Sequence, residues 1–344
     1  MEVQLDALQE ALGNAERVVI LPHNDPDPDA IASAVALQFL LSAHYRIESE
    51  VLYNGAIGRA ENRALVDFLD GALLPLTGPL PEQPILLVDT QPGAGNHSLP
   101  RNRQPVAVFD HHPLQAATAA APFADVRPDM GACATILTGY LQGAGLIPPP
   151  PIATALFYGI KSDTLSLARG VSAADVEAYV YLQPLIDADV LVEIERAQVP
   201  ADYFRNFSRA LRAARIYHNL LVVYVGRVGY PDMVGEVADW LLRLQGTRWV
   251  VALGVYKGVL RVAVRTRSRE GGAGRAAQAI VGEDGIAGGH GSMAGGQVPL
   301  EGRLPDGVVR SMRQRALAYF GLPASIGRRL MKLTSGEARR EADG

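Results

Sequence analysis

Four short segments of the chain carry carboxylates and imidazoles at the point where an apolar or helical run ends. The densest, residues 18–33, reads VVILPHNDPDPDAIAS: an apolar run typical of a buried strand, then a histidine and three aspartates, then small residues of helical character. Open α/β sheets bind ligands at the carboxyl ends of their strands, and divalent cations take carboxylate and imidazole ligands. The segments therefore predict a metal site built from His23, Asp27, Asp29, Asp89, Asp110, His111, His112 and Asp163.

The number of these groups favours a pair of cations over unpaired charges. Clustered carboxylates raise one another's pKa and cost several kcal/mol when buried. Two divalent ions about 3.5–4 Å apart relieve that repulsion, and the common chemistry of such pairs is in-line attack at phosphorus. Taken alone, DPDPD is typical of an exposed turn or a helix cap, and DHH of a cap with a surface imidazole. Their joint occurrence at strand ends favours the metal centre.

The same residues resemble the motifs of the DHH phosphoesterase superfamily, which is named after the triplet found here at residues 110–112. A His, three residues, an Asp, one residue and a second Asp form the first motif, matched by His23, Asp27 and Asp29. Asp89 in LLVDT matches the second motif, and GIKSDT at residues 159–164 matches the fourth. The resemblance covers roughly residues 15–300, with all four motifs in order.

The resemblance implies two Mn²⁺ ions, with Mg²⁺ or Co²⁺ as substitutes. His112 is then expected to face the substrate phosphate, as an electrostatic stabiliser or a proton donor, and Asp110 either binds a metal or orients a histidine. Asp25 falls at a variable position and is not expected to bind. The implied ligands are His23 and Asp27 for one ion, Asp29, His111 and Asp163 for the other, and Asp89 as a bridge.

A second motif, in the last third of the chain, points to a substrate-binding domain. Gly288, Gly289 and His290 in AGGHGSMAGG match the Gly-Gly-His motif of a DHH-associated domain, although Ala287 and Met293 depart from it. Glycines allow close backbone approach, and their N–H groups can cradle phosphate oxygens. The resemblance implies that this motif grips a phosphate or base together with Arg265, and Arg267 is a weaker candidate.

The elements that must position these residues alternate between strands and helices. The apolar strands show no alternation, which predicts a parallel, doubly wound α/β sheet, and a smaller mixed α/β domain follows it. In that domain Lys257-Gly258 predicts a two-residue hairpin turn, and residues 287–296 are expected to form a glycine-rich loop. The predicted division is 1–190 for the metal-binding domain, 191–215 for a helical linker, 216–322 for the substrate-binding domain and 323–344 for a disordered tail.

Composition limits the class of protein. The length of 344 residues favours two domains, and the single cysteine excludes a disulfide framework. No apolar run is long enough to span a bilayer and the first residues are acidic, so we expect a soluble, cytoplasmic protein without a membrane partner. Residues 1–200 carry 10 basic and 24 acidic residues, whereas residues 201–344 carry 22 and 12. This asymmetry is consistent with cations held in one half and anions in the other.

The expected substrate is a very short oligonucleotide. The Gly-Gly-His domain favours a nucleotide over bare pyrophosphate, and the Lys/Arg-rich signature of the pyrophosphatase branch is not found. The chain is similar to nanoRNases, which degrade dinucleotides such as pApA and pGpG and often act on 3′-phosphoadenosine-5′-phosphate. A cyclic-dinucleotide phosphodiesterase and a catalytically inactive nucleotide-binding regulator are alternatives; the complete ligand set argues against the second. The oligomeric state stays open, with a homodimer as one option.

Overall fold

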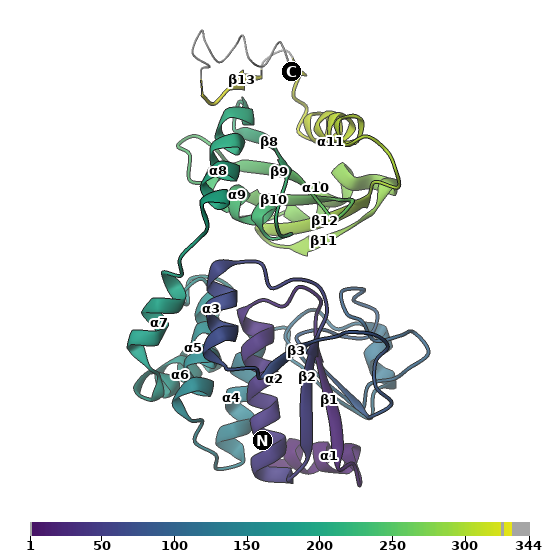
Figure 1. Ribbon diagram of the computed structural model, residues 1–344, viewed down its shortest axis with the longest axis vertical. Coiled ribbons are helices and arrows are strands. Elements are labelled where there is room, and N and C mark those ends of the chain that lie inside the picture. Colours follow the sequence, from purple (N-terminus) through teal and green to yellow (C-terminus); the bar gives the residue numbers. More distant parts are fainter. Residues whose placement is uncertain (1, 325–326, 332–344) are drawn as a thin grey trace. The chain divides into compact units, whose positions relative to one another are not determined.

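The computed structural model describes residues 2–324 and 327–331. The chain divides into two compact units, Met1–Gln198 and Val199–Gly344. Figure 1 labels helices and strands of each unit. The division falls inside the segment 191–215 that the sequence predicts as a connection. Most of the tail predicted to be disordered lies outside the described residues.

The first unit is built on a six-stranded sheet in which every pairing is parallel. The strand order is β3-β2-β1-β4-β5-β6, so the direction of winding reverses between β1 and β4. In open sheets such a reversal leaves a crevice at the carboxyl ends of the two strands, where ligands bind. The strands are β1 (Arg17–Pro22), β2 (Glu48–Tyr53), β3 (Leu73–Pro75), β4 (Ile85–Val88), β5 (Ala107–Asp110) and β6 (Phe123–Val126).

Helices pack on one face of this sheet and connecting segments on the other. Buried residues of α1, α2, α4 and α5 form the larger core with alternate strand residues. On the opposite face, Leu21 and Leu87 pack with Leu99 of the β4–β5 connection. The helices are α1 (Glu2–Leu12), α2 (Pro28–Leu40), α3 (Ala60–Phe68), α4 (Cys133–Gly143), α5 (Pro150–Asp163), α6 (Ala173–Leu182) and α7 (Ala188–Glu195), with a π-helical turn at Leu41–Tyr45 and 3₁₀ turns at Ala116–Ala120 and Gln183–Leu185.

The last two residues of the proline run at residues 148–151, Pro150 and Pro151, form the first turn of α5. A helix leaves its first N–H groups without intrahelical partners, so proline is tolerated there.

The second unit contains a mixed seven-stranded sheet in the order β11-β12-β10-β9-β8-β7-β13. Among the described strands of this sheet, only β8 and β9 pair in parallel. The prediction of a parallel α/β domain followed by a mixed domain is therefore confirmed. The strands are β7 (Arg215–Tyr217), β8 (Leu220–Arg227), β9 (Trp249–Tyr256), β10 (Val259–Thr266), β11 (Ile286–His290), β12 (Met293–Pro299) and β13 (Arg328–Arg329); the helices are α8 (Ala201–Ala213), α9 (Met233–Leu241), α10 (Ala273–Val281) and α11 (Pro305–Tyr319), with a 3₁₀ turn at Gly282–Asp284.

Two hairpins show how local sequence shapes this sheet. Lys257 and Gly258 join β9 to β10 with φ of 44° and 79°, as the predicted two-residue turn requires. The expected glycine-rich loop at residues 287–296 is instead the hairpin of β11 and β12. Gly289 has a φ of +134°, and a Cβ there would lie 2.5 Å from Ala294 Cα, so the close pairing of these strands requires glycine. Among the described residues, none of the helices combines the length and apolar character that a membrane span needs.

Candidate metal centre

The predicted ligands meet at the carboxyl edge of the parallel sheet. His23 follows β1, Asp89 follows β4, and His111 follows β5. The remaining ligands come from helix ends, since Asp27 is the N-cap of α2 and Asp163 is the last residue of α5. Within the described residues, three sets have ligand atoms within 4.8 Å of one another: His23, Asp27 and Asp89; Asp29, His111 and Asp163; and Asp89, His111 and His112.

In the first set, the protein fixes which nitrogen of His23 can bind a cation. His23 Nδ1 lies 2.9 Å from the carbonyl oxygen of Asn24, which can only accept, so Nδ1 carries the proton. His23 Nε2 is left with its lone pair, 3.7 Å from Asp27 Oδ1 and 3.5 Å from Asp89 Oδ2. Asp27 is held in turn by the backbone N–H groups of Asp29 and Ala30, both 3.1 Å from its Oδ1.

The second set repeats this arrangement around His111. Its Nδ1 lies 3.3 Å from the carbonyl oxygen of Met130. Its Nε2 lies 3.8 Å from Asp29 Oδ2 and 3.2 Å from Asp163 Oδ2. The same Nε2 is 3.4 Å from Asp89 Oδ1. Asp89 therefore presents Oδ2 to one imidazole and Oδ1 to the other, as a bridging carboxylate would.

These separations fit two bound cations better than direct hydrogen bonds. Ligands at 2.0–2.1 Å from a shared ion lie about 2.8–3.4 Å apart in octahedral or tetrahedral geometry, at or slightly below the separations here. Moreover, Asp89 Oδ1 is buried and accepts no hydrogen bond from any described residue. A buried carboxylate oxygen without a donor is costly, so it calls for a cation.

Electrostatics also indicate missing positive charge. Burial, and then the charges of Asp89 and Asp163, raise the pKa of Asp29 well above its ordinary value. Burial and the charge of Asp27 raise the pKa of Asp163 to about 6. Burial alone would lower the pKa of His23, but the neighbouring carboxylates of Asp27 and Asp89 outweigh burial and raise that pKa well above its ordinary value. Divalent cations would compensate this crowded charge.

Asp29 is further held by the start of α4. Its Oδ2 accepts from the N–H of Cys133 and its Oδ1 from that of Ala134, both at 2.7 Å. A carboxylate at a helix N-terminus is stabilised by the unsatisfied N–H groups and the helix dipole. Gly159 of the fourth motif lets α5 approach here, because a Cβ would lie 3.3 Å from Asp29 Cα.

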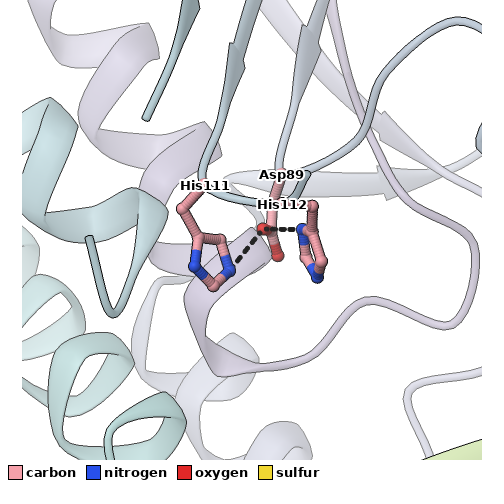
Figure 2. A group of neighbouring side chains, drawn as sticks. All are labelled: Asp89, His111 and His112. Atoms are coloured by element: carbon pink, nitrogen blue, oxygen red, sulfur yellow. Dashed lines mark ion pairs between the residues drawn. The ribbon is translucent and has the colours of Figure 1, made fainter. Parts of the chain in front are cut away.

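Asp110 is committed to His112 rather than to the ligand sets. Its Oδ1 lies 2.8 Å from His112 Nδ1 and also accepts from two backbone N–H groups, while its Oδ2 accepts from Gln91 Nε2 at 2.7 Å. Although burial lowers it, the hydrogen bond to Asp110 and the charge of Asp89 raise the pKa of His112 to about 9. Figure 2 shows His111 and His112 on opposite sides of the Asp89 carboxylate. The geometry favours the orienting role for Asp110.

Sequence reasoning missed Gln91 and Asn24, which support this centre. Gln91 is fully buried; besides Asp110 it contacts the carbonyls of His112 and Pro113, and its Oε1 accepts from Thr118 Oγ1 at 2.9 Å. Asn24 accepts from Ser98 Oγ at 2.8 Å while its carbonyl holds His23. The only sequence signal was their position beside a predicted ligand. Asp25, not expected to bind a metal, accepts instead from the N–H of Ala56 at 2.8 Å.

The predicted substrate-binding residues lie in the second unit. Arg265 is 2.6 Å from Asp239 Oδ1 through Nε, and its Nη1 donates to the carbonyls of Val264 and Ala294. The backbone N–H of Arg267 donates to the Arg248 carbonyl, and the residue is exposed. Gly288, Gly289 and His290 lie in β11, opposite Gly295, Ala294 and Met293 of β12. Most of the Arg265 donors are thus used within the fold.

Comparison with known proteins identifies the family of this fold and site. Residues 17–160 match the family model described as the DHH family, N-terminal domain. The first unit therefore contains a DHH-family domain.

Two curated relatives match the sequence. An uncharacterized protein of Methanocaldococcus jannaschii is 34% identical over 287 residues, which cover 82% of this chain and 58% of the relative. A probable manganese-dependent inorganic pyrophosphatase of Staphylococcus saprophyticus is 27% identical over 175 residues, covering 51% of this chain and 57% of the relative. The chain therefore spans less than three fifths of either.

Solved structures share the fold. An exopolyphosphatase-related protein from Bacteroides fragilis superposes with a TM-score of 0.68 at 14% identity, covering 93% of this chain and 97% of that one. RecJ from Thermus thermophilus in complex with Mn²⁺ gives a TM-score of 0.55 at 16% identity, covering 93% of this chain and 54% of RecJ.

Proposed function

We propose that this protein is a metal-dependent phosphoesterase that uses two Mn²⁺ ions to hydrolyse very short oligonucleotides, such as pApA and pGpG, or 3′-phosphoadenosine-5′-phosphate. One observation carries the proposal: Asp89 presents its two oxygens to two imidazoles, 3.5 Å and 3.4 Å away, and each imidazole belongs to its own set of acids. The DHH-family domain of the first unit supports a hydrolase of this class. The manganese named for the Staphylococcus relative and for RecJ supports the choice of metal.

The residues divide into ligands and a proton-handling pair. His23 and Asp27 would hold one ion, Asp29, His111 and Asp163 the other, with Asp89 between them. Divalent ions held by these residues would supply a nucleophile from water and neutralise charge at phosphorus. Asp110 holds the Nδ1 side of His112, so a protonated His112 can stabilise a phosphate oxygen or protonate the leaving oxygen.

Pyrophosphate is the second candidate substrate, since the Staphylococcus relative is named as a probable inorganic pyrophosphatase. We place it below nucleotides because the second unit carries the Gly-Gly-His hairpin and the Lys/Arg-rich pyrophosphatase signature is not found in the sequence. A cyclic-dinucleotide phosphodiesterase keeps the same centre with a different substrate. A catalytically inactive regulator is disfavoured because every ligand position of the motifs carries an Asp or His that can bind a metal.

A substrate panel tests the proposal. Purified protein with Mn²⁺ is given pApA, pGpG, a five-residue RNA, 3′-phosphoadenosine-5′-phosphate, a cyclic dinucleotide and pyrophosphate. We expect turnover of the dinucleotides, abolished by Asp89→Ala. Turnover of pyrophosphate alone would show that pyrophosphate, and not a nucleotide, is the substrate. The absence of turnover with every compound would contradict the proposal that the protein is an enzyme.

A further inference from the structure

The segment after Asp163 has an unusual backbone. Leu165, Ser166 and Leu167 have φ of 50°, 58° and 61°, so three consecutive non-glycine residues adopt the left-handed conformation. Side chains other than glycine normally visit this region as single residues, because the Cβ approaches the following carbonyl. Such conformations persist where the surroundings hold them, and they gather at functional sites.

Thr164 holds this turn from both sides. Its Oγ1 donates to the carbonyl of Ile160 at 2.5 Å and accepts from the N–H of Leu167 at 3.0 Å. Its carbonyl accepts from the N–H groups of Ala168 and Arg169, both at 2.9 Å. The turn is therefore fastened to the last turn of α5 and is not a loose connection.

The turn brings Arg169 back against Asp163. Arg169 Nη2 donates to the carbonyl of Asp163 at 2.6 Å and lies 3.9 Å from its Oδ1. The other oxygen of that carboxylate, Oδ2, lies 3.2 Å from His111 Nε2. The Asp163 carboxylate thus lies between the Arg169 guanidinium and the His111 imidazole.

The remaining donors of Arg169 are available to a ligand. Within the described residues its Nε and Nη1 have no hydrogen-bond or ion-pair partner. The side chains of Arg169 and Asp163 are 30% and 27% exposed, so a ligand can reach both. In contrast, Arg127 spends Nε and Nη2 on the two oxygens of Asp125.

We propose that Arg169 binds a non-bridging phosphate oxygen of the substrate at the rim of the metal centre, and that the left-handed turn positions it there. This inference rests on the proposed function. Guanidinium groups suit this role because their planar fork matches phosphate oxygens. Figure 2 shows His112 on the opposite side of Asp89 from His111. Asp163 lies near His111 and near Arg169. The Arg169 guanidinium and a protonated His112 would therefore contact the phosphate from different sides.

The test compares Arg169→Gln and Arg169→Lys with wild type, using the best substrate of the panel. Arg17→Gln is the matched control, because Arg17 is exposed, pairs with Glu48 and begins β1 at the end remote from the site. We expect Arg169→Gln to lower kcat/KM by about 100-fold, as for loss of one preorganised charge-stabilising donor. It should also weaken inhibition by inorganic phosphate while leaving the Mn²⁺ stoichiometry unchanged. Arg169→Lys should recover part of the activity, and Arg17→Gln should retain all of it.

The outcomes separate this inference from the proposed function. Full activity of Arg169→Gln beside an active wild type overturns the inference and leaves the function standing. If the wild type hydrolyses none of the substrates, the proposed function is wrong. If, in that case, Mn²⁺-loaded wild type and Arg169→Gln also bind inorganic phosphate with equal affinity, the phosphate-binding role of Arg169 is wrong as well. If both Arg169 variants lose Mn²⁺, Arg169 serves to hold Asp163 in place, and its proposed phosphate-binding role is wrong. If Arg169→Gln does not fold, unchanged kcat/KM and phosphate inhibition in Arg169→Lys overturn it.

Discussion

At the scale of single residues, each imidazole of the metal centre has one nitrogen committed to the protein. His23 and His111 lie against backbone carbonyls through Nδ1, whereas His112 lies against the Asp110 carboxylate. A carbonyl partner fixes the neutral tautomer that suits a metal ligand, while a carboxylate partner favours the protonated ring. The partners thus separate two ligand histidines from one proton-handling histidine.

Asp110→Asn tests this distinction. The substitution keeps the shape but removes the charge that orients His112, so kcat should fall about 10–100-fold, as for other groups that orient active-site residues. Isothermal titration should show unchanged Mn²⁺ binding. Asp284→Asn is the control, since that carboxylate pairs with Arg303 and Arg315 in the second unit. Mn²⁺ affinity falling together with kcat would make Asp110 a ligand instead.

The ligand residues were predictable from the sequence because they follow apolar strands, whereas the residues that contact and position them were not. Gln91 gains its role only when the ends of β4 and β5 meet beside Thr118. Arg169 depends on a left-handed turn built from Leu165, Ser166 and Leu167, residue types that do not signal it. Gln91 depends on tertiary contacts and Arg169 on an uncommon local backbone conformation, and residue patterns specify neither.

At the scale of elements, continuous apolar strands were predictable and the glycine hairpin was not. Residues 85–88 form β4 as expected, because a fully buried parallel strand has no polar face. β11 and β12 contain one β-branched residue each, Ile286 and Val298, among glycines and alanines, which is a weak strand signal. The pairing of β12 with β10 and of β11 with β12 decides the outcome. β3 has only three residues and Asp125 interrupts β6, so neither gives the continuous apolar pattern of β4.

Two adjacent glycines of this hairpin should respond differently to alanine. Gly289→Ala adds a Cβ 2.5 Å from Ala294 Cα at a φ of +134°, so we expect destabilisation of the second unit by about 2–5 kcal/mol. Gly288→Ala meets nothing within 4 Å and should cost less than about 1 kcal/mol. Urea unfolding followed by circular dichroism measures both. Equal effects would contradict the hairpin geometry.

The turn after α5 gives a second pair of variants. Ser166→Gly relieves a left-handed φ of 58° and should leave activity intact while stabilising by up to about 1 kcal/mol. Ser166→Pro cannot adopt that φ and loses the N–H bond to the Lys161 carbonyl, so Asp163 and Arg169 should be displaced and turnover lost. Thermal unfolding and kcat/KM report the two effects. A stable, active Ser166→Pro would show that the turn is not required.

At the scale of the whole molecule, charge is divided between the two parts of the chain. Residues 1–200 have a net charge of −14 and contain all the predicted metal ligands, whereas residues 201–344 have a net charge of +10 and contain the Gly-Gly-His hairpin. This division suits a protein that holds cations in one unit and binds an anionic substrate with the other.

Without metal, the protein should lose stability as pH rises from about 5 to about 8. Because the pKa of His23 is raised in the folded protein, the protonated imidazole stabilises the fold fully below pH 6.5, and this stabilisation is lost as the pH rises further. The pKa values of Asp29 and Asp163 are also raised, so the ionisation of these carboxyls destabilises the fold as the pH rises. Asp27 and Asp110 have lowered pKa values, so their contributions are complete before this window. Melting temperatures of EDTA-treated protein measure the slope.

Saturating Mn²⁺ should reverse this trend, because its ligands must be deprotonated and its stabilisation therefore grows with pH. A metal-free melting temperature that rises over the same range, or a larger Mn²⁺ shift at pH 5 than at pH 8, would contradict the clustered arrangement of these acids.

The most direct test of the metal centre is a crystal structure of the Mn²⁺-loaded protein with anomalous scattering recorded at the manganese edge. We predict two peaks on either side of the Asp89 carboxylate, one contacted by His23 and Asp27 and the other by Asp29, His111 and Asp163. A single peak, or peaks that Asp89 does not join, would contradict the two-metal account.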